Sequence, residues 1–210
     1  LLGTYLFSTN NAKSDIKILY QKEGILGQIM VVDYPVYQSA ETPDYYIRMM
    51  LFNRVIQAID NKHDSVNKYF PYVHLLIKES KNHFKGGNAL LLGLGGGCVA
   101  NELIKNNFKV DAVELDKRVA DAAIKYFGLH PGVSVFIDDA RRYINNCTKK
   151  YDLIIFDVFK GEENPAHIIT QESLTLIKKS LNPDGMIVLN GYGFRNGNKS
   201  KGMKAIVKTI

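Results

Sequence analysis

From residue 89 onward, the chain alternates between strand-sized apolar runs and segments with the apolar period of a helix. The predicted strands cover residues 89–92, 109–114, 133–137, 151–157 and 186–190. The predicted helices between them cover residues 99–106, 117–127, 141–147 and 171–181. Strands that alternate with helices form right-handed crossovers, so their sheet is parallel and covered on both faces. We therefore expect an α/β fold of the Rossmann type, with ligands bound beyond the carboxyl ends of the strands.

The first 60 or so residues follow a different pattern, in which short strand-like runs succeed one another. These runs cover residues 4–8, 16–21, 28–33 and 47–57, the last with a turn at Asn53-Arg54. We expect a small antiparallel β subdomain over residues 1–62. A helix predicted over residues 66–84 then leads into the Rossmann-like domain of residues 63–210, which we expect to stop short of the last strands of such sheets.

The composition is that of a globular protein, with 46% hydrophobic and 23% charged residues. Its apolar stretches are far shorter than the roughly 20 residues that span a bilayer, so we expect no membrane contact from this segment. Cys98 and Cys147 form no Cys-x-x-Cys pair, and the histidines are scattered, so we expect neither a disulfide framework nor a metal site. This cysteine usage fits a reducing, cytoplasmic location.

Most of the net charge of +6 comes from a basic segment near the carboxyl end. That segment contains Arg195, Lys199, Lys201, Lys204 and Lys208. The remainder of the chain is close to neutral, and no groove motif of alternating aromatic and basic residues accompanies the segment. The charge therefore does not favour nucleic acid as a partner.

A glycine-rich turn joins the predicted strand at residues 89–92 to the helix that follows it. Gly93, Gly95 and Gly97 belong to this turn, and the absence of side chains lets backbone N–H groups approach a ligand closely. The alternative is a tight turn whose glycines serve only its backbone geometry. A dinucleotide fingerprint is incomplete, because Cys98 stands where its third glycine would be.

Acidic residues follow the next two predicted strands. Glu114 ends a strand 21 residues after Gly93, where a carboxylate can accept hydrogen bonds from both ribose hydroxyls. Asp138 and Asp139 follow the strand after that, and one of them is expected to accept a hydrogen bond from an adenine amino group. The alternatives are helix caps, with Glu114 capping the helix that follows it and Asp138 capping the helix at residues 141–147.

Asp157 is the candidate catalytic residue. It is the single acid at the end of the apolar strand 151–157, where desolvation and a nearby cation would both act on its pKa. There it can orient or deprotonate an attacking amine. A capping aspartate in a loop is the alternative. Residues 181–185 read as a helix end followed by a turn, with a structural role only.

The glycine turn, Glu114, Asp138-Asp139 and Asp157 together resemble the spermidine synthase (aminopropyltransferase) family, over roughly residues 16–193. The resemblance implies an S-adenosylmethionine-dependent methyltransferase fold with a small N-terminal β subdomain. It also implies S-adenosylmethionine or its decarboxylated form as co-substrate, an amine as the acceptor, and a homodimer. No metal is implied.

The N-terminal part carries the same resemblance. The segments Gly27–Val31 and Val55–Gln57 and the residue Tyr72 are similar to the β domain and lead-in helix of that family. By resemblance, Gln57 and Tyr72 contact the donor or the acceptor amine, with Gln57 assigned to the donor and Tyr72 to catalysis.

Two positions depart from the family pattern. Gly96 stands where the family has an acid that holds the aminopropyl ammonium, and Lys160 stands where it has a second aspartate. Ordinary S-adenosylmethionine carries a carboxylate that an acid at position 96 would repel and that a glycine amide can bind. Residues 157–167 also resemble domains that follow a multi-pass membrane region, which would make this segment the cytoplasmic part of a tethered protein.

We therefore expect a transferase that moves a methyl or aminopropyl group to an amine or another nucleophile, with methyl transfer favoured. One alternative is a nucleoside-binding sensor that has lost turnover, motivated by Gly96 and Lys160. Another is a methyltransferase that acts on nucleic acid or protein, motivated by the basic segment. Fold analogy does not choose among these reactions.

Overall fold

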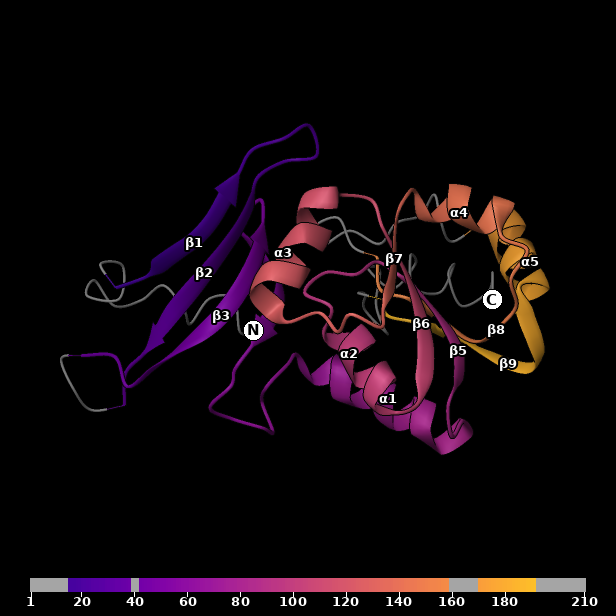
Figure 1. Cartoon of the computed structure of the whole chain (residues 1–210), viewed down its shortest axis with the longest axis horizontal. Helices are drawn as coiled ribbons and strands as arrows, with labels where there is room; N and C mark the ends of the chain where they lie inside the picture. Colours follow the sequence, from indigo (N-terminus) through magenta and orange to yellow (C-terminus); the bar gives the residue numbers. More distant parts are fainter. Residues whose placement is uncertain (1–14, 39–41, 159–169, 192–210) are drawn as a thin grey trace, which may run out of the picture. The chain divides into compact units, whose positions relative to one another are not determined.

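A computed structural model describes residues 15–38, 42–158 and 170–191 of the chain (Figure 1). The chain forms two compact units, Leu1–Pro71 and Tyr72–Ile210. The domain boundary expected between residues 62 and 63 falls before the boundary between these units. The strand expected at residues 4–8 lies outside the described residues.

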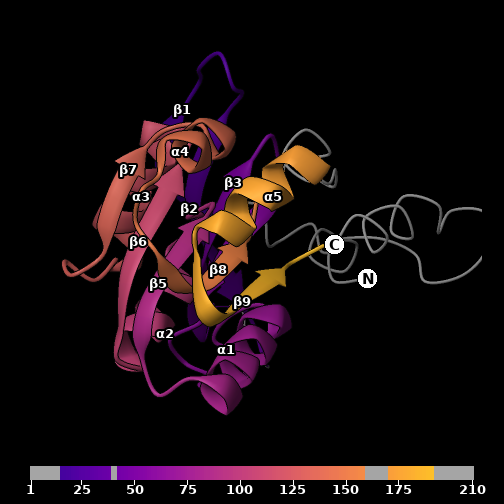
Figure 2. The ribbon, with the colours of Figure 1, turned by 90° about the vertical axis from the view of Figure 1, so that its right-hand side faces the viewer.

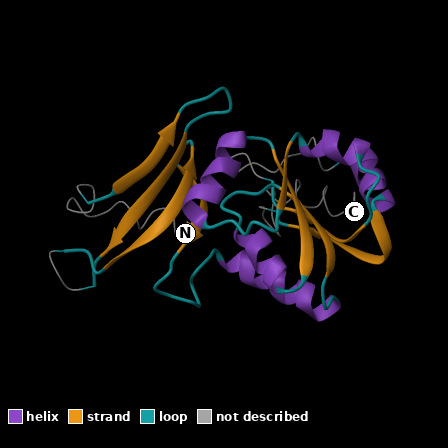
Figure 3. Cartoon of the chain, in the orientation of Figure 1, coloured by secondary structure: helices purple, strands orange, loops and turns teal. Residues whose placement is uncertain are grey.

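The first unit contains a four-stranded antiparallel sheet with the order β1-β2-β3-β4 (Figure 3). Its strands are β1 (Lys17–Lys22), β2 (Ile29–Val36), β3 (Tyr45–Phe52) and β4 (Val55–Asp60). Asn53 and Arg54 both have positive φ, 48° and 68°, as the tightest hairpin turns require. The run expected at residues 47–57 is thus two strands joined by the predicted turn. Asp33 and Arg48 face each other across β2 and β3 and form a two-pronged ion pair, with N–O distances of 2.7 and 2.8 Å.

The second unit contains a five-stranded sheet with the order β7-β6-β5-β8-β9, in which every neighbouring pair is parallel. The strands are β5 (Gly87–Leu92), β6 (Phe108–Glu114), β7 (Ser134–Ile137), β8 (Tyr151–Phe156) and β9 (Leu181–Leu189). The helices are α1 (Pro71–His83), α2 (Cys98–Lys105), α3 (Lys117–Phe127), α4 (Ala140–Asn146) and α5 (Gln171–Lys179). The chain therefore has the expected α/β fold, in which an antiparallel sheet precedes a Rossmann-like domain.

The central strands β5 and β8 are apolar on both faces. Leu90 and Ile154 pack with α4 and α5 residues in one cluster, whereas Leu91 and Ile155 point to the opposite face. All four side chains are 0% exposed. Figure 1 shows α4 and α5 on one side of the sheet and α1, α2 and α3 on the other, and Figure 2 shows β9 between α5 and α1. Because both faces are covered, these strands read as continuous apolar runs in the sequence.

Two element boundaries differ from the prediction. α1 begins at Pro71 rather than at residue 66, because Val66 is 75% exposed and lies in a turn where the Asp64 carboxylate accepts from the N–H groups of Val66 and Asn67. A proline fits the first position of a helix, where its missing N–H costs nothing. β9 begins at Leu181, so the predicted turn at residues 181–185 lies inside this strand. It forms an irregularity in the pairing with β8, because Tyr151 pairs with Leu181 but Leu153 pairs with Met186.

We predict that Leu91→Ala lowers the free energy of unfolding by about 2–5 kcal/mol, because it leaves a cavity in a core covered on both faces. Leu75→Ala is the matched control, since Leu75 is 61% exposed on α1. The control should change stability by no more than about 0.5 kcal/mol. Urea denaturation measures both, and equal losses would contradict this description of the core.

Candidate functional site

Five residues form a row where the parallel strands end. The backbone hydrogen-bond ladder continues one residue beyond the strands, so neighbours in the sheet remain neighbours at its carboxyl edge. In sheet order the row is Asp138, Glu114, Gly93, Asp157 and Asn190. The bonds run from Asp138 N to Glu114 O (3.0 Å), Gly93 N to Val113 O (2.8 Å), Asp157 N to Leu92 O (2.8 Å) and Asn190 N to Phe156 O (2.9 Å). The sheet thus brings together four of the positions singled out in the sequence and adds Asn190.

The three predicted glycines serve different purposes. Gly93 has φ 91°, and a Cβ there would lie 2.3 Å from the Asp157 carbonyl oxygen, so two backbones meet at this point. Gly97 has φ 76° and starts α2, with a Cβ position 2.6 Å from Leu129 Cδ1. Gly95 has φ 52°, but nothing lies within 4 Å of its Cβ position. Positive φ is thus a structural reason for all three glycines, and a steric contact adds to it at Gly93 and Gly97. At Gly95 the backbone also faces open space in which a ligand can approach.

Glu114 spans the glycine turn and the loop after β6. Its Oε2 accepts from Leu94 N at 3.1 Å, and its Oε1 accepts from Asp116 N at 2.9 Å. The alternative role as a cap of α3 is wrong, because the Asp116 side chain caps that helix by accepting from Arg118 N. Burial raises the pKa of Glu114, and the backbone donors oppose this rise. The Gly95 N–H also donates to this carboxylate. A carboxylate has about four acceptor sites, so Glu114 can still accept a further hydrogen bond, for example from a ribose hydroxyl.

Asp139, not Asp138, caps α4. The helix begins at Ala140, one residue earlier than predicted, so Asp139 takes the N-cap position and accepts from Arg142 N at 2.9 Å. Asp138 instead pairs with the Arg142 side chain. The expectation that Asp138 caps this helix is therefore wrong. Both aspartates keep acceptor capacity, and the contact of one of them with adenine stays a prediction.

Two exposed apolar side chains flank these acids and were not singled out in the sequence. Leu115 follows Glu114 and is 54% exposed, and Ile137 precedes Asp138 and is 45% exposed. Such side chains beside polar groups suit a flat heteroaromatic ring, whose faces are apolar and whose edge is polar. The sequence contained a signal for them. Each is an apolar residue at the end of a predicted strand, a position that is usually exposed to solvent and therefore usually polar.

Asp157 has a donor on each of its carboxylate oxygens. Tyr72 donates its hydroxyl to Oδ2 at 2.9 Å, and Asn190 donates an amide N–H to Oδ1 at 2.8 Å. Burial raises the pKa of Asp157, and the two hydrogen bonds act in the opposite direction. Burial and the aspartate charge raise the pKa of Tyr72, so its hydroxyl remains a donor. The structure thus joins the two predicted catalytic residues, whose catalytic role itself stays a prediction.

Sequence reasoning missed Asn190 because it treated this residue as the end of a strand. β9 ends at Leu189, and Asn190 is the first residue beyond it. The available signal was a polar residue at the carboxyl end of a predicted strand. That this strand neighbours β8 is known only from the structure.

Gln57 lies in β4 of the first unit, where the pairing with β3 changes register. Met50 pairs with Ala58 and Leu51 pairs with Ile56, so Gln57 is the extra residue of a bulge. Bulges redirect a side chain, but the donor contact of Gln57 stays a prediction. Lys160, the segment through residue 167 and the basic segment from Arg195 lie outside the described residues.

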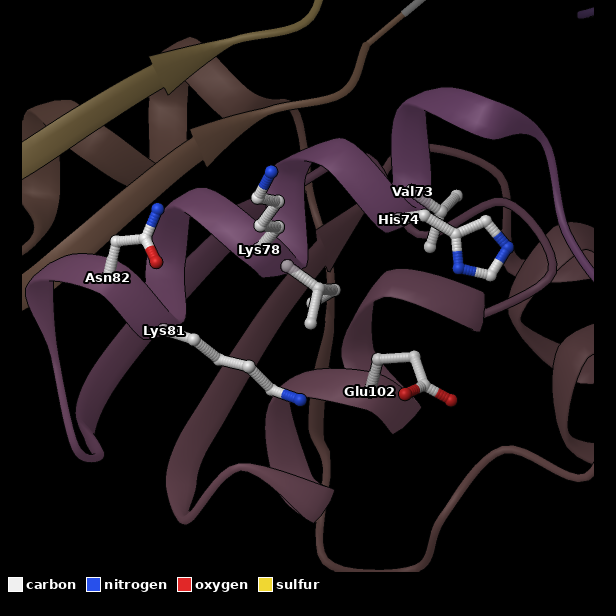
Figure 4. Close-up of a pocket in the computed structure, with 7 residues that line it drawn as sticks. Val73, His74, Lys78, Lys81, Asn82 and Glu102 are labelled. Carbon is white, nitrogen blue, oxygen red and sulfur yellow. The ribbon is translucent and has the colours of Figure 1, made fainter. Parts of the chain in front are cut away.

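A separate hollow of about 330 Å³ lies along α1 and α2 (Figure 4). It is lined by Val73, His74, Ile77, Lys78, Lys81, Asn82 and Glu102. Lys81 and Glu102 reach toward it from the two helices. None of its lining residues belongs to the row at the strand ends, so this hollow is not the predicted donor site.

Within residues 15–38, 42–158 and 170–191, no three His, Cys, Asp or Glu side chains gather as a metal site. No helix in the described part of the chain is long and apolar enough to cross a membrane.

We predict that Gly93→Ala destabilises the protein by about 3 kcal/mol or more, because a left-handed backbone and a clash with another backbone add together. Gly128→Ala is the matched control, since Gly128 has φ 64° but nothing within 4 Å of its Cβ position. The control should lose only about 1–2 kcal/mol, the cost of the left-handed backbone alone. Chemical denaturation compares them, and similar losses would show that the β5–β8 approach is not tight.

We predict that the stability of the protein depends on pH through Asp157. Because burial raises the pKa of Asp157, the folded protein keeps this proton to a higher pH than the unfolded chain. The protonated Asp157 carboxyl therefore stabilises the fold fully at pH values below its pKa in the unfolded chain. This stabilisation is lost as pH rises through its pKa in the folded protein. Relative to Asp157→Asn, the wild-type free energy of unfolding should therefore fall as pH rises from about 4.

Urea denaturation at a series of pH values measures this difference. Glu172→Gln supplies a control of opposite sign, because hydrogen bonds from its own backbone and from Thr170 lower the pKa of Glu172. Wild-type stability relative to this control should rise with pH over the acidic range. If the difference in free energy of unfolding between the wild type and Asp157→Asn did not change with pH, this would contradict the burial of an ionisable carboxyl at the strand end.

The chain is 36% identical over 131 residues to a polyamine aminopropyltransferase from Vibrio vulnificus, a match that covers 59% of this chain and 44% of that protein. It is 34% identical over 113 residues to an N-terminal histidine N-methyltransferase from Emericella nidulans, covering 51% of this chain and 20% of that protein. The chain thus spans less than half the length of these curated relatives.

A probable spermidine synthase from Corynebacterium glutamicum has the same fold, with a TM-score of 0.73 at 22% identity, over 90% of this chain and 68% of that one. Residues 72–194 match the spermine/spermidine synthase domain. This range contains every member of the strand-end row together with Tyr72. The chain therefore belongs to the spermine/spermidine synthase domain family.

Proposed function

We propose that this chain carries the donor site and the catalytic aspartate of a transferase that uses S-adenosylmethionine or its decarboxylated form. The group transferred is a methyl or aminopropyl group, and the acceptor is an amine or another nucleophile. The observation that carries this proposal is the row at the carboxyl edge of the sheet, in which Glu114, Gly93 and Asp157 are neighbours. Relatives named as an aminopropyltransferase and as an N-methyltransferase support the reaction class.

The donor would bind across the glycine turn. Glu114 offers acceptor capacity to the ribose hydroxyls, and the open space at Gly95 admits the ligand to the backbone. Leu115 and Ile137 supply apolar surface for the adenine ring, and Asp138 or Asp139 supplies an acceptor for its amino group. Gln57 is proposed, by resemblance alone, as a further donor contact.

Asp157 would act on the acceptor. As a carboxylate it accepts a hydrogen bond from the amine and aligns the nitrogen lone pair with a carbon attached to the sulfonium. The N–C bond forms as the C–S bond breaks, the electron pair of that bond neutralises the sulfur, and the proton of the amine passes to Asp157 or to water. Tyr72 would keep the carboxylate in place through its hydrogen bond to Oδ2.

The start of α2 favours the carboxylated donor. Gly96 is buried and has no carboxylate, the helix has no side-chain cap, and its first turn contains no acid. Helix N-terminal N–H groups attract anions such as the carboxylate of S-adenosylmethionine. We therefore favour methyl transfer over aminopropyl transfer.

A nucleoside-binding sensor without turnover is the second candidate, and the observation that favours it is the same loss of an acid at Gly96. Donor binding without any product from amines would support the sensor. A small amine as acceptor, a homodimeric assembly and a cytoplasmic location remain further proposals for the whole protein. So does methylation of a protein or nucleic acid.

Calorimetric titration with S-adenosylmethionine and with its decarboxylated form tests the proposed donor. We expect tighter binding of the carboxylated donor, and a loss of about tenfold or more in Glu114→Ala, because a ribose hydrogen bond to a charged group disappears. Gly96→Asp should reverse the preference, and its backbone can accept aspartate because Gly96 does not have positive φ.

Three results would count against this reading of the donor site. Preference of the wild-type protein for the decarboxylated donor would restore aminopropyl transfer as the main reaction. If Gly96→Asp kept the wild-type preference between the two donors, residue 96 would not determine donor specificity. Binding of neither donor to the wild-type protein would contradict the site itself.

A further inference from the structure

We propose that Asn190 is a positioning residue that fixes the Asp157 carboxylate in the orientation used for transfer. The proposal rests on the proposed function, because it assigns Asn190 to the same catalytic aspartate. It goes beyond that function by naming a residue that acts through Asp157.

The geometry comes from neighbouring strand ends. Asn190 N donates to Phe156 O at 2.9 Å, and Asp157 N donates to Leu92 O at 2.8 Å, so both residues are held by the ladder of one rigid sheet. From that position the short Asn190 side chain donates to Asp157 Oδ1 at 2.8 Å. A residue anchored by its backbone and bonded through its amide loses little further freedom when it orients a neighbour.

The two donors on Asp157 come from opposite directions in the chain. Tyr72 reaches Oδ2 from the first turn of α1, and Asn190 reaches Oδ1 from the end of β9. One hydrogen bond leaves a carboxylate free to rotate about its last torsion, whereas a donor on each oxygen fixes its plane. The remaining lone pairs then face one direction, as alignment of an acceptor amine requires.

The Asn190 amide also stabilises the charged form of Asp157. The Asp157 side chain is partly buried, and no described lysine or arginine forms an ion pair with it. The ionisable group that contacts it is Tyr72 from α1, which itself lies near Cys98 of α2. A neutral amide donor therefore opposes the effect of burial without adding a positive charge that would repel a cationic donor or acceptor.

The test is a direct measurement of the Asp157 carboxyl pKa by NMR of protein with ¹³C-labelled aspartate, in which Asp157→Asn identifies the signal. Asn190→Leu keeps the approximate shape of the side chain and removes the donor. We expect the Asp157 pKa to rise by about one unit, because a hydrogen bond to the charged form is lost. Asn190→Gln keeps an amide donor and should recover most of the wild-type value.

Asn190→Ser provides a second variant if leucine prevents folding, because serine is polar but too short to replace the amide bond, and its Asp157 pKa should also rise. An Asp157 pKa unchanged in Asn190→Leu or Asn190→Ser would overturn the proposal. An equal rise in Asn190→Gln would overturn it as well, since any substitution would then have the same effect. Donor titration of the same proteins separates the two proposals: failure to bind donor refutes the proposed function, whereas the pKa series alone decides the role of Asn190.

Discussion

The close approach of β5 and β8 at Gly93 and Asp157 is the constraint on which the site depends. A side chain at Gly93 would meet the Asp157 carbonyl oxygen at 2.3 Å, so the two strand ends adopt this distance only because glycine is present. The approach lets the hydrogen-bond ladder continue past both strands. It therefore sets the position of Asp157 relative to the glycine turn, and in the proposed function this is the position of the group that aligns the acceptor relative to the donor.

The same edge carries an electrostatic cost that indicates the charge of its ligand. Glu114 and Asp157 are both buried enough for their pKa values to rise, and both are supported by neutral N–H or O–H donors. No described lysine or arginine forms an ion pair with either carboxylate. A buried carboxylate without a cation is costly, and a cationic ligand reduces that cost. A sulfonium nucleoside and an amine are ligands of this kind.

The sequence predicts the parts of this arrangement that follow from periodicity, and misses those that depend on one-residue offsets. β5 and β8 are apolar on both faces, so their continuous apolar runs predict from the sequence that they lie in the core. The cap of α4 is assigned to Asp138 rather than Asp139 because the helix begins one residue early. Asn190 is missed because its role depends on which strand neighbours β8 and on where β9 ends, which a single strand pattern does not contain. Gln57 illustrates the same limit, since its bulge arises from pairing with β3.

In the proposed function, the type of group transferred would be decided at the start of α2 rather than at Asp157. Attack on a sulfonium-bound carbon requires the same alignment of an amine whether that carbon is a methyl or the end of an aminopropyl chain. The proposed roles of Asp157, Tyr72 and Asn190 would therefore suit either reaction. The two donors differ in charge at the far end of the molecule, where one has a carboxylate and the other does not. Gly96 has no carboxylate, and the first turn of α2 has neither a side-chain cap nor an acid. Because helix N-terminal N–H groups attract an anion, position 96 would favour the donor that has a carboxylate, whereas the residues around Asp157 would serve both reactions.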